Sequence, residues 1–309
     1  MNTSHFIVGE WGSTFMRLHL CIREAGTVQI LAHVGGHGVL GCEDFESAFF
    51  DAAQPWFNVH GPVPVILAGM IGSNIGWRDT GYAACPISSD RIEGVHFQTR
   101  GIDITIMPGL RCQNIFGLPD VVRGEEMQMF GWLDDQARAP NEQHIICLPG
   151  RHVKWVAALG HCVQSFFTGM NGEMEELLIQ HSLLGRGVLQ TEQLSDPDYT
   201  IGRNLMFDDP TLSVGHALFA TRSRLVLRDH TPETAASFLA GVLIGGDIRD
   251  AMRAYVSRDM INGPVIVIGT TPLANLYAAE LVNLGHPAQQ VKDPDLAIKG
   301  LARFALASV

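Results

Sequence analysis

The sequence predicts an α/β protein built from two domains of similar design. Three short strand patterns separated by tight turns open the chain, and the same order of strand, loop, strand, turn and strand starts again at His144. After each opening, helical periodicity alternates with short buried-strand runs. Two domains related in this way are expected to face each other across a cleft, where strand ends and helix starts form ligand sites.

The first domain is expected over residues 1–135. Alternating apolar residues predict its three opening strands, and continuous apolar runs that stop at glycine or proline predict two buried strands. Apolar residues at helical spacing predict a helix on either side of those buried strands. The expected strands are 5–11, 15–22, 27–34, 63–68 and 101–107, and the expected helices are 43–57 and 123–135.

The second domain is expected over residues 144–309, after a polar, proline-containing boundary at 136–143. Residues 190–212 are rich in Asp, Pro and Thr and are expected to form a surface loop or an insertion. The expected strands of this domain are 145–148, 153–159, 162–167 and 265–268, and the expected helices are 172–182, 231–257 and 272–284.

Composition excludes several classes of protein. A formal charge of −11 over 309 residues, without clusters of Lys and Arg, argues against a nucleic-acid surface. No apolar run approaches the roughly 18 residues of a membrane span, and the first residues do not resemble a signal peptide. The six cysteines lack Cys-x-x-Cys spacing, which indicates reduced thiols in a cytoplasmic protein, and no His/Cys cluster has the spacing of a structural zinc site.

The first hairpin turn is the most informative segment of the chain. A buried strand leads to Glu10, and Gly12, Ser13 and Thr14 form the turn before the next strand. Turn amides and hydroxyls form an anion-binding concavity, and the carboxylate suits a hydrated Mg²⁺ ion. This pattern predicts a site for nucleotide phosphates, although a hairpin turn without function has the same residues.

A second informative segment is Arg123-Gly124-Glu125-Glu126 at the start of an expected helix. Acids in a first helical turn are favoured by the helix dipole, which explains them without any function. In the functional interpretation, Glu125 faces the cleft as general base on a substrate hydroxyl and Arg123 binds an anionic substrate group. Glu126 is expected to face solvent or to pair with a nearby base.

The glycine-rich stretch after residue 68 contains residue types that are suited to binding a sugar. Gly69 lets the backbone approach a ligand closely, Ser73 and Asn74 offer hydrogen bonds, and Trp77 provides a flat apolar wall. A plain glycine turn with a core tryptophan fits the same residues.

The second domain repeats the pattern of a turn beside a strand, now with basic groups. Lys154 has an alternative role as a solvated strand residue. Two glycine turns, at Gly245-Gly246 and at Gly269-Thr270-Thr271, are expected to flank an adenine and a ribose. The residues expected to bind the nucleotide are Gly150, His152, Lys154, Gly245, Gly246, Gly269 and Thr270.

Taken in order, these motifs resemble the 2-dehydro-3-deoxygalactonokinase family along nearly the whole chain. The order is Glu-Trp-Gly-Ser-Thr, Ala-Gly-Met-Ile-Gly-Ser-Asn-Ile-Gly-Trp, Arg-Gly-Glu-Glu-Met-Gln and Pro-Gly-x-His-x-Lys-Trp. The resemblance implies two actin-like (ribonuclease H-like) ATPase domains. It also implies Mg²⁺-dependent transfer of the ATP γ-phosphoryl group to the 6-hydroxyl of 2-dehydro-3-deoxy-D-galactonate, in D-galactonate catabolism.

The resemblance also implies roles by position. The first lobe would bind the sugar acid and carry the first phosphate loop at Gly12, Ser13 and Thr14, and the second lobe would bind the nucleotide. Gly150 and its neighbours would form the second phosphate loop, and Gly269 and Thr270 would hold the nucleoside. The sugar pocket would contain Asn74, Trp77 and Arg123, beside Gly69 and Ser73, with Glu125 as the acid that takes the hydroxyl proton and Glu10 at the metal.

Two residues depart from the family pattern, which has Asp where this chain has Glu10 and a small hydroxyl residue where it has Arg151. Glu10 is one methylene longer, so the metal geometry must shift or include another water. Two alternatives therefore stay open, a kinase of another sugar acid and a catalytically silent sugar- or nucleotide-binding protein. The expected ligands are a small sugar acid and ATP, without nucleic acid or membrane, and a homodimer is left open.

Overall fold

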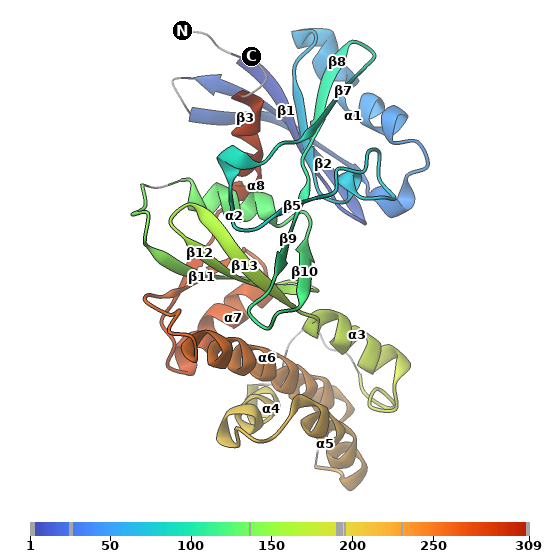
Figure 1. Cartoon of the computed structure of the whole chain (residues 1–309). Helices are drawn as coiled ribbons and strands as arrows, with labels where there is room; N and C mark the ends of the chain where they lie inside the picture. The colour runs from blue at the N-terminus through green and yellow to red at the C-terminus, as the bar shows by residue number, and fades with distance from the viewer. Residues whose placement is uncertain are drawn as a thin grey trace. The chain divides into compact units, whose positions relative to one another are not determined.

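The chain forms two compact units. The computed structural model describes residues 4–24, 27–135, 137–189, 194, 196–229 and 231–306. Unit 1 consists of Met1–Glu142, Ala158–Phe166 and Asp293–Val309, and unit 2 of Gln143–Ala157 and Phe167–Lys292. The colours of Figure 1 show how the red C-terminal segment α8 belongs with the blue strands of unit 1.

Unit 1 is built on a six-stranded sheet with the order β3-β2-β1-β4-β8-β7. Strands β1, β4 and β8 run parallel, whereas β2, β3 and β7 pair antiparallel with their neighbours. The buried runs at β1 and β4 have the continuous apolar character of strands covered on both faces. The bounds are β1 Ser4–Trp11, β2 Phe15–Glu24, β3 Thr27–His37, β4 Val65–Ala68, β7 Val95–Thr99 and β8 Ile102–Ile106.

Helix α1 (Phe45–His60) forms the main core of unit 1 with this sheet. Asp44 caps the helix by accepting a hydrogen bond from Ser47 N at 3.0 Å. Phe49 and Phe50 of α1 pack with strand residues such as Leu67 in one buried cluster. The helix therefore forms where the sequence predicts it, and it holds the strands that carry the first hairpin turn.

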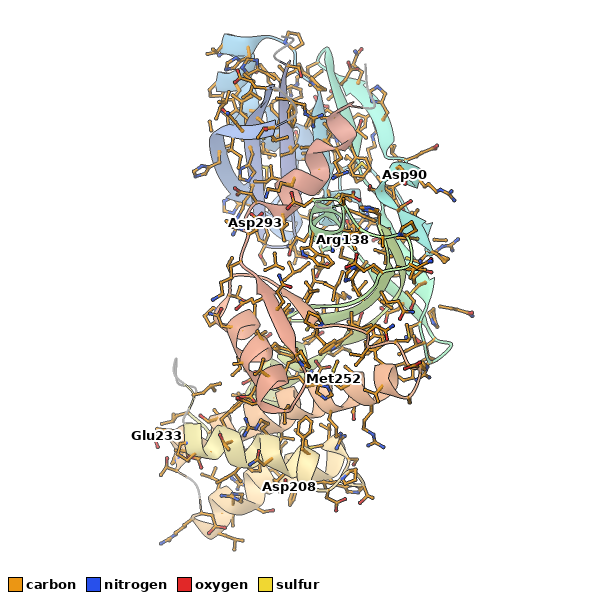
Figure 2. The ribbon with its side chains drawn as sticks, turned by 90° about the vertical axis from the view of Figure 1, so that its left-hand side faces the viewer. Asp90, Arg138, Asp208, Glu233, Met252 and Asp293 are labelled. Atoms are coloured by element: carbon orange, nitrogen blue, oxygen red, sulfur yellow. The ribbon has the colours of Figure 1, made fainter. Side chains whose placement is uncertain are left out.

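Helices α2 (Glu126–Leu133) and α8 (Leu296–Ala302) pack closely through glycines. A Cβ atom on Gly131 would lie 2.0 Å from Leu296 O, and one on Gly300 would lie 2.1 Å from Met127 O. Helix α8 also contacts β1 and β4. Because of this packing, the chain from Asp293 onward, labelled in Figure 2, belongs to unit 1. The units therefore differ from the expected continuous domains 1–135 and 144–309.

Shorter elements complete unit 1, and the sequence did not predict them. Strands β10, β9 and β5 form a separate three-stranded sheet. Cys162 and Val163 pair antiparallel with Ser88 and Ile87 of β6. The bounds are β5 Tyr82–Ala84, β6 Ile87–Ser88, β9 Gly109–Gln113, β10 Pro119–Val122, η1 Val39–Gly41, η2 Met70–Gly72, η3 Ser89–Arg91 and η4 Phe304–Leu306.

Unit 2 contains five helices among its described residues and most of a sheet of order β15-β14-β11-β12-β13-β6, of which Ala158–Phe166 and β6 belong to unit 1. Strands β11, β14 and β15 are parallel. The strand bounds are β11 Gln143–Leu148, β12 Val153–Leu159, β13 Cys162–Gly169, β14 Val265–Ile268 and β15 Ala288–Val291. The helix bounds are α3 Asn171–His181, α4 Asp196–Asp208, α5 Val214–Leu227, α6 Pro232–Val256 and α7 Pro272–Asn283.

Helix α6 corrects one prediction. Gly245 and Gly246 are buried inside this helix rather than in a turn. A Cβ atom on Gly245 would lie 3.0 Å from Arg203 Cα on α4, and one on Gly246 would lie 2.5 Å from Val214 Cγ2 on α5. The two glycines thus allow α4 and α5 to approach α6 closely. The predicted turn is wrong, and neighbouring helices cover both glycines.

The loop expected at 190–212 is also wrong in part. Helix α4 occupies Asp196–Asp208, and Gly202 packs so closely on α6 that a Cβ there would lie 2.2 Å from Phe238 O. Residues 190–193 and 195 lie outside the described residues, as does Gln136 in the expected boundary. Among the described helices, none is long and apolar enough to cross a lipid bilayer.

Candidate active site

The predicted residues of unit 1 gather where parallel strands end. Glu10 on β1 is in register with Ala68 on β4, so both strands end at the same edge of the sheet. Gly69 has φ of +98°, and a Cβ atom there would lie 2.8 Å from Trp11 O. A Cβ atom on Gly124 would lie 3.9 Å from Gly69 Cα. The ends of β1 and β4 therefore meet the segment that leads into α2, at the edge where α/β sheets bind ligands.

Glu10 lies half-buried at this edge. Its cross-strand neighbour is Arg17 on β2. Burial raises the pKa of Glu10, and the charge of Arg17 lowers it by a smaller amount. A cation beside the carboxylate would act in the same direction as Arg17 and favour the ionised form.

The turn at Gly12, Ser13 and Thr14 is held by backbone contacts. Gly12 N donates to Phe15 O at 2.8 Å, and the carbonyl groups of Gly12 and Ser13 accept from Val39 N and Leu40 N, each at 3.0 Å. Within the described part of the chain, the amides of Ser13 and Thr14 have no protein partner. The turn thus presents two adjacent N–H groups, as expected for an anion-binding loop.

Glu125 stands at the N-cap position of α2. Its carbonyl group accepts from Gln128 N and Met129 N, each at 3.1 Å, while its side chain makes no capping hydrogen bond. The residue is half-buried and follows Gly124 directly. This places a carboxylate at the positive end of a helix, beside the strand ends that carry Glu10 and Gly69.

Glu126 overturns the expectation of a solvent-facing acid. It is fully buried, and its Oε2 accepts a hydrogen bond from Gly124 N. Its Oε1 has no hydrogen-bond partner. Burial and the charge of Glu125 raise the pKa of Glu126 to about 8, so the carboxyl group is neutral at pH 7. The distant helix α8 covers α2, which no local sequence signal reveals.

The guanidinium group of Arg123 makes its contacts with residues of unit 1. Its Nη2 donates to Gly81 O at 2.7 Å and its Nη1 to Thr80 Oγ1 at 3.1 Å, while the guanidinium group lies 4.4 Å from the centre of the Tyr82 ring. Thr80 in turn donates to Gly72 O at 3.0 Å. Arg123 therefore braces the loop after β4, and its binding of a substrate anion stays a prediction.

The other predicted sugar contacts differ in exposure. Asn74 is exposed, whereas Ser73 is buried and donates to Met70 O at 2.7 Å. The Trp77 ring packs against Phe49 and Phe97, at centroid distances of 5.8 and 5.3 Å. These contacts make Trp77 part of the core, so they support the interpretation as a core tryptophan rather than as a wall for the sugar.

In unit 2, two predicted loops follow neighbouring parallel strands. Gly150 comes after β11, and Gly269 with Thr270 comes after β14. Gly269 has φ of +144°, and its N–H donates to Val291 O at 3.2 Å. Parallel strands end at the same edge, so both loops lie at the carboxyl edge of this sheet.

The basic residues of the second loop make contacts inside unit 2. His152 Nε2 lies 2.5 Å from Glu173 Oε2, and Arg151 Nη2 lies 3.0 Å from Glu176 Oε2, so both turn toward α3. The hydrogen bond from His152 lowers the pKa of Glu173. Lys154 is buried, and its Nζ donates to Thr168 Oγ1 at 2.7 Å.

Sequence reasoning did not predict a role for Asp247. Its Oδ2 accepts hydrogen bonds from Trp155 Nε1 at 3.0 Å and from Tyr277 Oη at 2.9 Å. The Asn171 side chain also hydrogen-bonds to it. The signal that was available is an acid directly after the two glycines of α6, at the end of the apolar run that precedes them in this helix.

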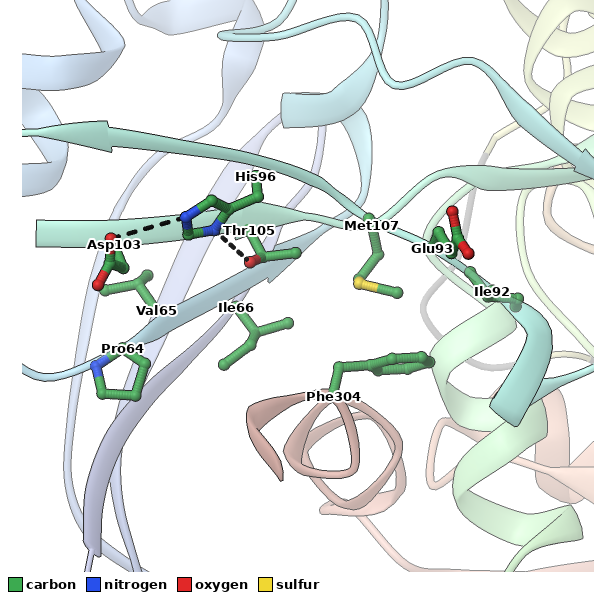
Figure 3. Close-up of a pocket in the computed structure, with 11 residues that line it drawn as sticks. Pro64, Val65, Ile66, Ile92, Glu93, His96, Asp103, Thr105, Met107 and Phe304 are labelled. Carbon is green, nitrogen blue, oxygen red and sulfur yellow. Dashed lines mark hydrogen bonds and ion pairs between the residues drawn. The ribbon is translucent and has the colours of Figure 1, made fainter. Parts of the chain in front are cut away.

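A separate cavity of about 630 Å³ lies on unit 1 over β4, β7 and β8 (Figure 3). His96 lies between Asp103 and Thr105 there, with its Nε2 3.6 Å from Asp103 Oδ1 and its Nδ1 3.4 Å from Thr105 Oγ1. His96 and Thr105 are direct partners in the β7–β8 register. These contacts are ordinary cross-strand pairs, and the predicted site residues do not line this cavity.

Comparison with known proteins identifies the family to which this chain is similar. The model of 2-keto-3-deoxy-galactonokinase matches residues 10–304. A 2-dehydro-3-deoxygalactonokinase of Escherichia coli (strain K12) is 31% identical over 282 residues, which cover 90% of this chain and 89% of that protein. A crystal structure from Sinorhizobium meliloti, of a protein proposed to be a 2-dehydro-3-deoxygalactonokinase, has a TM-score of 0.86 at 26% identity and 98% coverage of both chains.

A more distant structure shows the fold alone. The activator of 2-hydroxyisocaproyl-CoA dehydratase from Clostridium difficile, solved with bound ADPNP, has a TM-score of 0.50 at 11% identity. It covers 98% of this chain and 94% of that chain. The mixed α/β architecture is that of the actin-like ATPases, as the sequence motifs predict. With a family model that spans almost all of its length, the chain belongs to the 2-keto-3-deoxy-galactonokinase family.

Proposed function

We propose that this chain transfers the γ-phosphoryl group of ATP to the 6-hydroxyl of 2-dehydro-3-deoxy-D-galactonate, a step in D-galactonate breakdown. Membership of the family supports the reaction class. The observation that carries the assignment to particular residues lies in unit 1. Glu125 stands at the start of α2, next to a glycine whose backbone approaches Gly69 at the ends of β1 and β4.

Glu125 acts as the general base in this proposal. Its carboxylate accepts the proton of the sugar 6-hydroxyl as the bond from that oxygen to the γ-phosphorus forms. The bond between the γ-phosphorus and the β,γ-bridging oxygen breaks at the same time, and ADP leaves with those electrons. The carboxylate stands at the positive end of α2, where a negative charge is favoured.

The remaining predicted residues are assigned by unit. In unit 1, the amides of Ser13 and Thr14 bind phosphate oxygens, and Asn74 with Arg123 contacts the sugar acid. In unit 2, we assign Gly150, His152, Lys154, Gly269 and Thr270 to the nucleotide. Phosphoryl transfer depends mostly on positioning and on stabilising charge, so fixed amides and a buried lysine are suitable groups.

Glu10 is the carboxylate of unit 1 that would hold Mg²⁺, directly or through water. It fits because Mg²⁺ is commonly bound by one or two carboxylates together with phosphates and waters, and because Glu10 lies half-buried at the strand edge. When bound, the ion supplies positive charge to the phosphate oxygens. Glu10→Asp tests whether the longer side chain slows turnover.

The first experiment substitutes the proposed base. Glu125→Gln should lower kcat about 10²- to 10⁴-fold, because the amide cannot accept the hydroxyl proton, and should leave ATP affinity unchanged. ADP release is measured by a coupled assay, and ATP binding by calorimetry. Glu43→Gln, at an exposed acid outside the site, serves as the matched control. An unchanged kcat for Glu125→Gln rules out this role.

The second experiment tests the substrate. The enzyme is incubated with ATP, Mg²⁺ and a panel of sugar acids that includes 2-dehydro-3-deoxy-D-galactonate and its C4 epimer, and products are identified by ³¹P NMR. Fastest turnover with the galactonate derivative and a phosphate on O6 support the proposal. Preference for another acid supports a kinase of different specificity, and binding without turnover supports a silent binding protein.

A further inference from the structure

Asp247 connects four segments of unit 2 through one carboxylate. It projects from α6 to Trp155 on β12, to Tyr277 on α7 and to Asn171 at the start of α3. Asn171 Nδ2 also donates to Tyr277 Oη at 3.5 Å, which closes the network. A Cβ atom on Gly169 would lie only 2.4 Å from Asp247 Oδ1, so the β13–α3 junction passes directly over the carboxylate.

Each partner of Asp247 is close to a loop that the proposed function assigns to the nucleotide. Trp155 follows Lys154 on β12, the strand that leaves the loop containing Gly150. Asn171 precedes Gly172, where a Cβ atom would lie 2.8 Å from Arg151 Cα in that same loop. Tyr277 lies on α7, which begins directly after Gly269, Thr270 and Thr271. The carboxylate is therefore linked to the first predicted nucleotide loop through Trp155 and Asn171, and to the second through Tyr277 of the helix that follows it.

The chemistry of the network requires an acceptor. An indole N–H and a phenol O–H both point at Asp247 Oδ2, and among the described residues this oxygen is the acceptor for each of them. Tyr277 is fully buried and Trp155 is buried as well, so an unpaired donor on either would cost free energy. A buried polar network in which the donors are satisfied makes the surrounding structure rigid and specifies one geometry.

We propose that Asp247 is a positioning residue for nucleotide binding, because its carboxylate fixes the two loops of unit 2 through Trp155, Asn171 and Tyr277. The inference rests on the proposed function, which assigns those loops to ATP. Asp247 itself does not touch the reacting atoms in this role.

The network is sensitive to protonation. Burial raises the pKa of Asp247 to about 6, against the three hydrogen bonds that lower it. The titratable groups that face the carboxylate are Tyr277 on α7, Cys147 on β11 and Asp250 on α6. Asp247 is therefore ionised at pH 7.5 and becomes neutral as the pH falls through about 6, with weaker acceptance from Trp155 and Tyr277.

The test combines a structural signal with a binding constant. The chain has five tryptophans, and Trp155→Phe identifies the indole N–H signal of Trp155 in a ¹⁵N–¹H spectrum. In the wild type this signal should shift with a midpoint near pH 6, and the Kd for ATP should rise about 5- to 10-fold between pH 7.5 and 5.5. In Asp247→Asn the signal should not titrate, and the Kd should be raised at both pH values.

Asp250→Asn is the matched control, since Asp250 lies on the same helix, pairs with Arg249 at 2.8 Å and has a 58% exposed side chain. It should bind ATP at pH 7.5 as the wild type does, and the Trp155 signal should still titrate, with its midpoint moved only to lower pH because the charge of Asp250 raises the pKa of Asp247. If Asp247→Asn folds and binds ATP normally at both pH values, the inference is overturned. Kinase assays separate the two proposals, because normal ATP binding without turnover on any sugar acid contradicts the proposed function and leaves the binding result for Asp247 intact.

Discussion

The two units hold their predicted phosphate loops by different means. In unit 1, the turn at Gly12–Thr14 is fixed by backbone hydrogen bonds from Val39 and Leu40 and by the close approach of Gly38. In unit 2, the loop that contains Gly150 is held mainly through side chains of α3, since Glu173 contacts His152 and Glu176 pairs with Arg151, beside one backbone hydrogen bond from Glu173 N to Arg151 O.

The buried acids of the two units show the same contrast. Glu126 in unit 1 accepts one amide hydrogen bond and has an unpartnered oxygen, so burial dominates and raises its pKa to about 8. Asp247 in unit 2 accepts from three side chains, and burial raises its pKa only to about 6. Unit 1 thus relies on packing with a neutral acid, and unit 2 relies on an ionised network. Substitutions that add side-chain volume should therefore have their main effect in unit 1, and substitutions that remove a charge should have theirs in unit 2.

The largest effect is expected for Gly38→Ala in unit 1. The new Cβ atom would lie 2.4 Å from Ser13 O, Thr14 N and Phe15 N, so the turn must move. We expect a loss of about 2–4 kcal/mol in the free energy of unfolding and a fall in kcat/KM of more than 10²-fold. Chemical denaturation and the coupled ADP assay measure the two effects.

Gly35→Ala is the control for this change, because Gly35 lies on β3, the strand that ends directly before Gly38, and its Cβ atom would make only an ordinary contact at 3.6 Å with Met16 O. Equal losses in both variants would show that strand flexibility matters and not the close approach at the turn.

An effect of intermediate size, on the pH dependence of stability, is expected when Glu126 is substituted. Its pKa is raised from about 4.5 in the unfolded chain to about 8 in the folded protein, so folding takes up a proton between these values. The free energy of unfolding should therefore fall as pH rises through this window, by roughly 1.4 kcal/mol per pH unit at the steepest. Glu126→Gln should flatten that dependence in denaturation curves at pH 5.5, 7.0 and 8.5.

The neighbours of Glu126 allow this interpretation to be checked. The charge of Glu125 raises the pKa of Glu126 and the charge of Arg123 lowers it, both by less than burial raises it. Glu125→Gln should therefore preserve most of the pH dependence of stability. An unchanged slope in Glu126→Gln would mean that another group titrates.

The smallest effect is expected for Glu173→Gln in unit 2. The carboxylate holds His152 at 2.5 Å, but its partners are half-exposed and solvent screens the interaction. We expect the KM for ATP to rise about 2- to 5-fold, with a similar rise in wild type at high salt. Because the hydrogen bond lowers the pKa of Glu173, the difference should persist from pH 6 to 8. Glu176→Gln removes only the contact with Arg151 and should change the KM less.

Local sequence patterns predicted most of the long elements. The alternation in β1 and β2 and the helical spacing in α1 depend on neighbours within one element, so the expected strands and helices are present with small shifts at their ends. The short strands β5, β6 and β9 have only two to five residues each, which is too little for a periodic pattern.

The site was predictable where it depends on loops at strand ends, and less so where distant elements meet. Gly69 and Gly12 were identified because glycines after buried strands have a local signature. Gly245 and Gly246 were misread because the same residue type also serves close packing of helices. Helix α2 packs against α8, which follows it by about 170 residues, so local sequence patterns did not predict that most of α2, Glu126 included, is buried.

The placement of α8 has a consequence for synthesis on the ribosome. Unit 1 begins with the first strands to be made, yet α2 gains its glycine-mediated contact only when Leu296–Ala302 has been translated. At about 5–20 residues per second, the nascent chain waits roughly 10–30 s between the two helices. During that time the face of α2 at Met127 and Gly131 is without the helix that packs on it, so a truncation just before α8 should leave the first-made unit prone to chaperone capture and proteolysis.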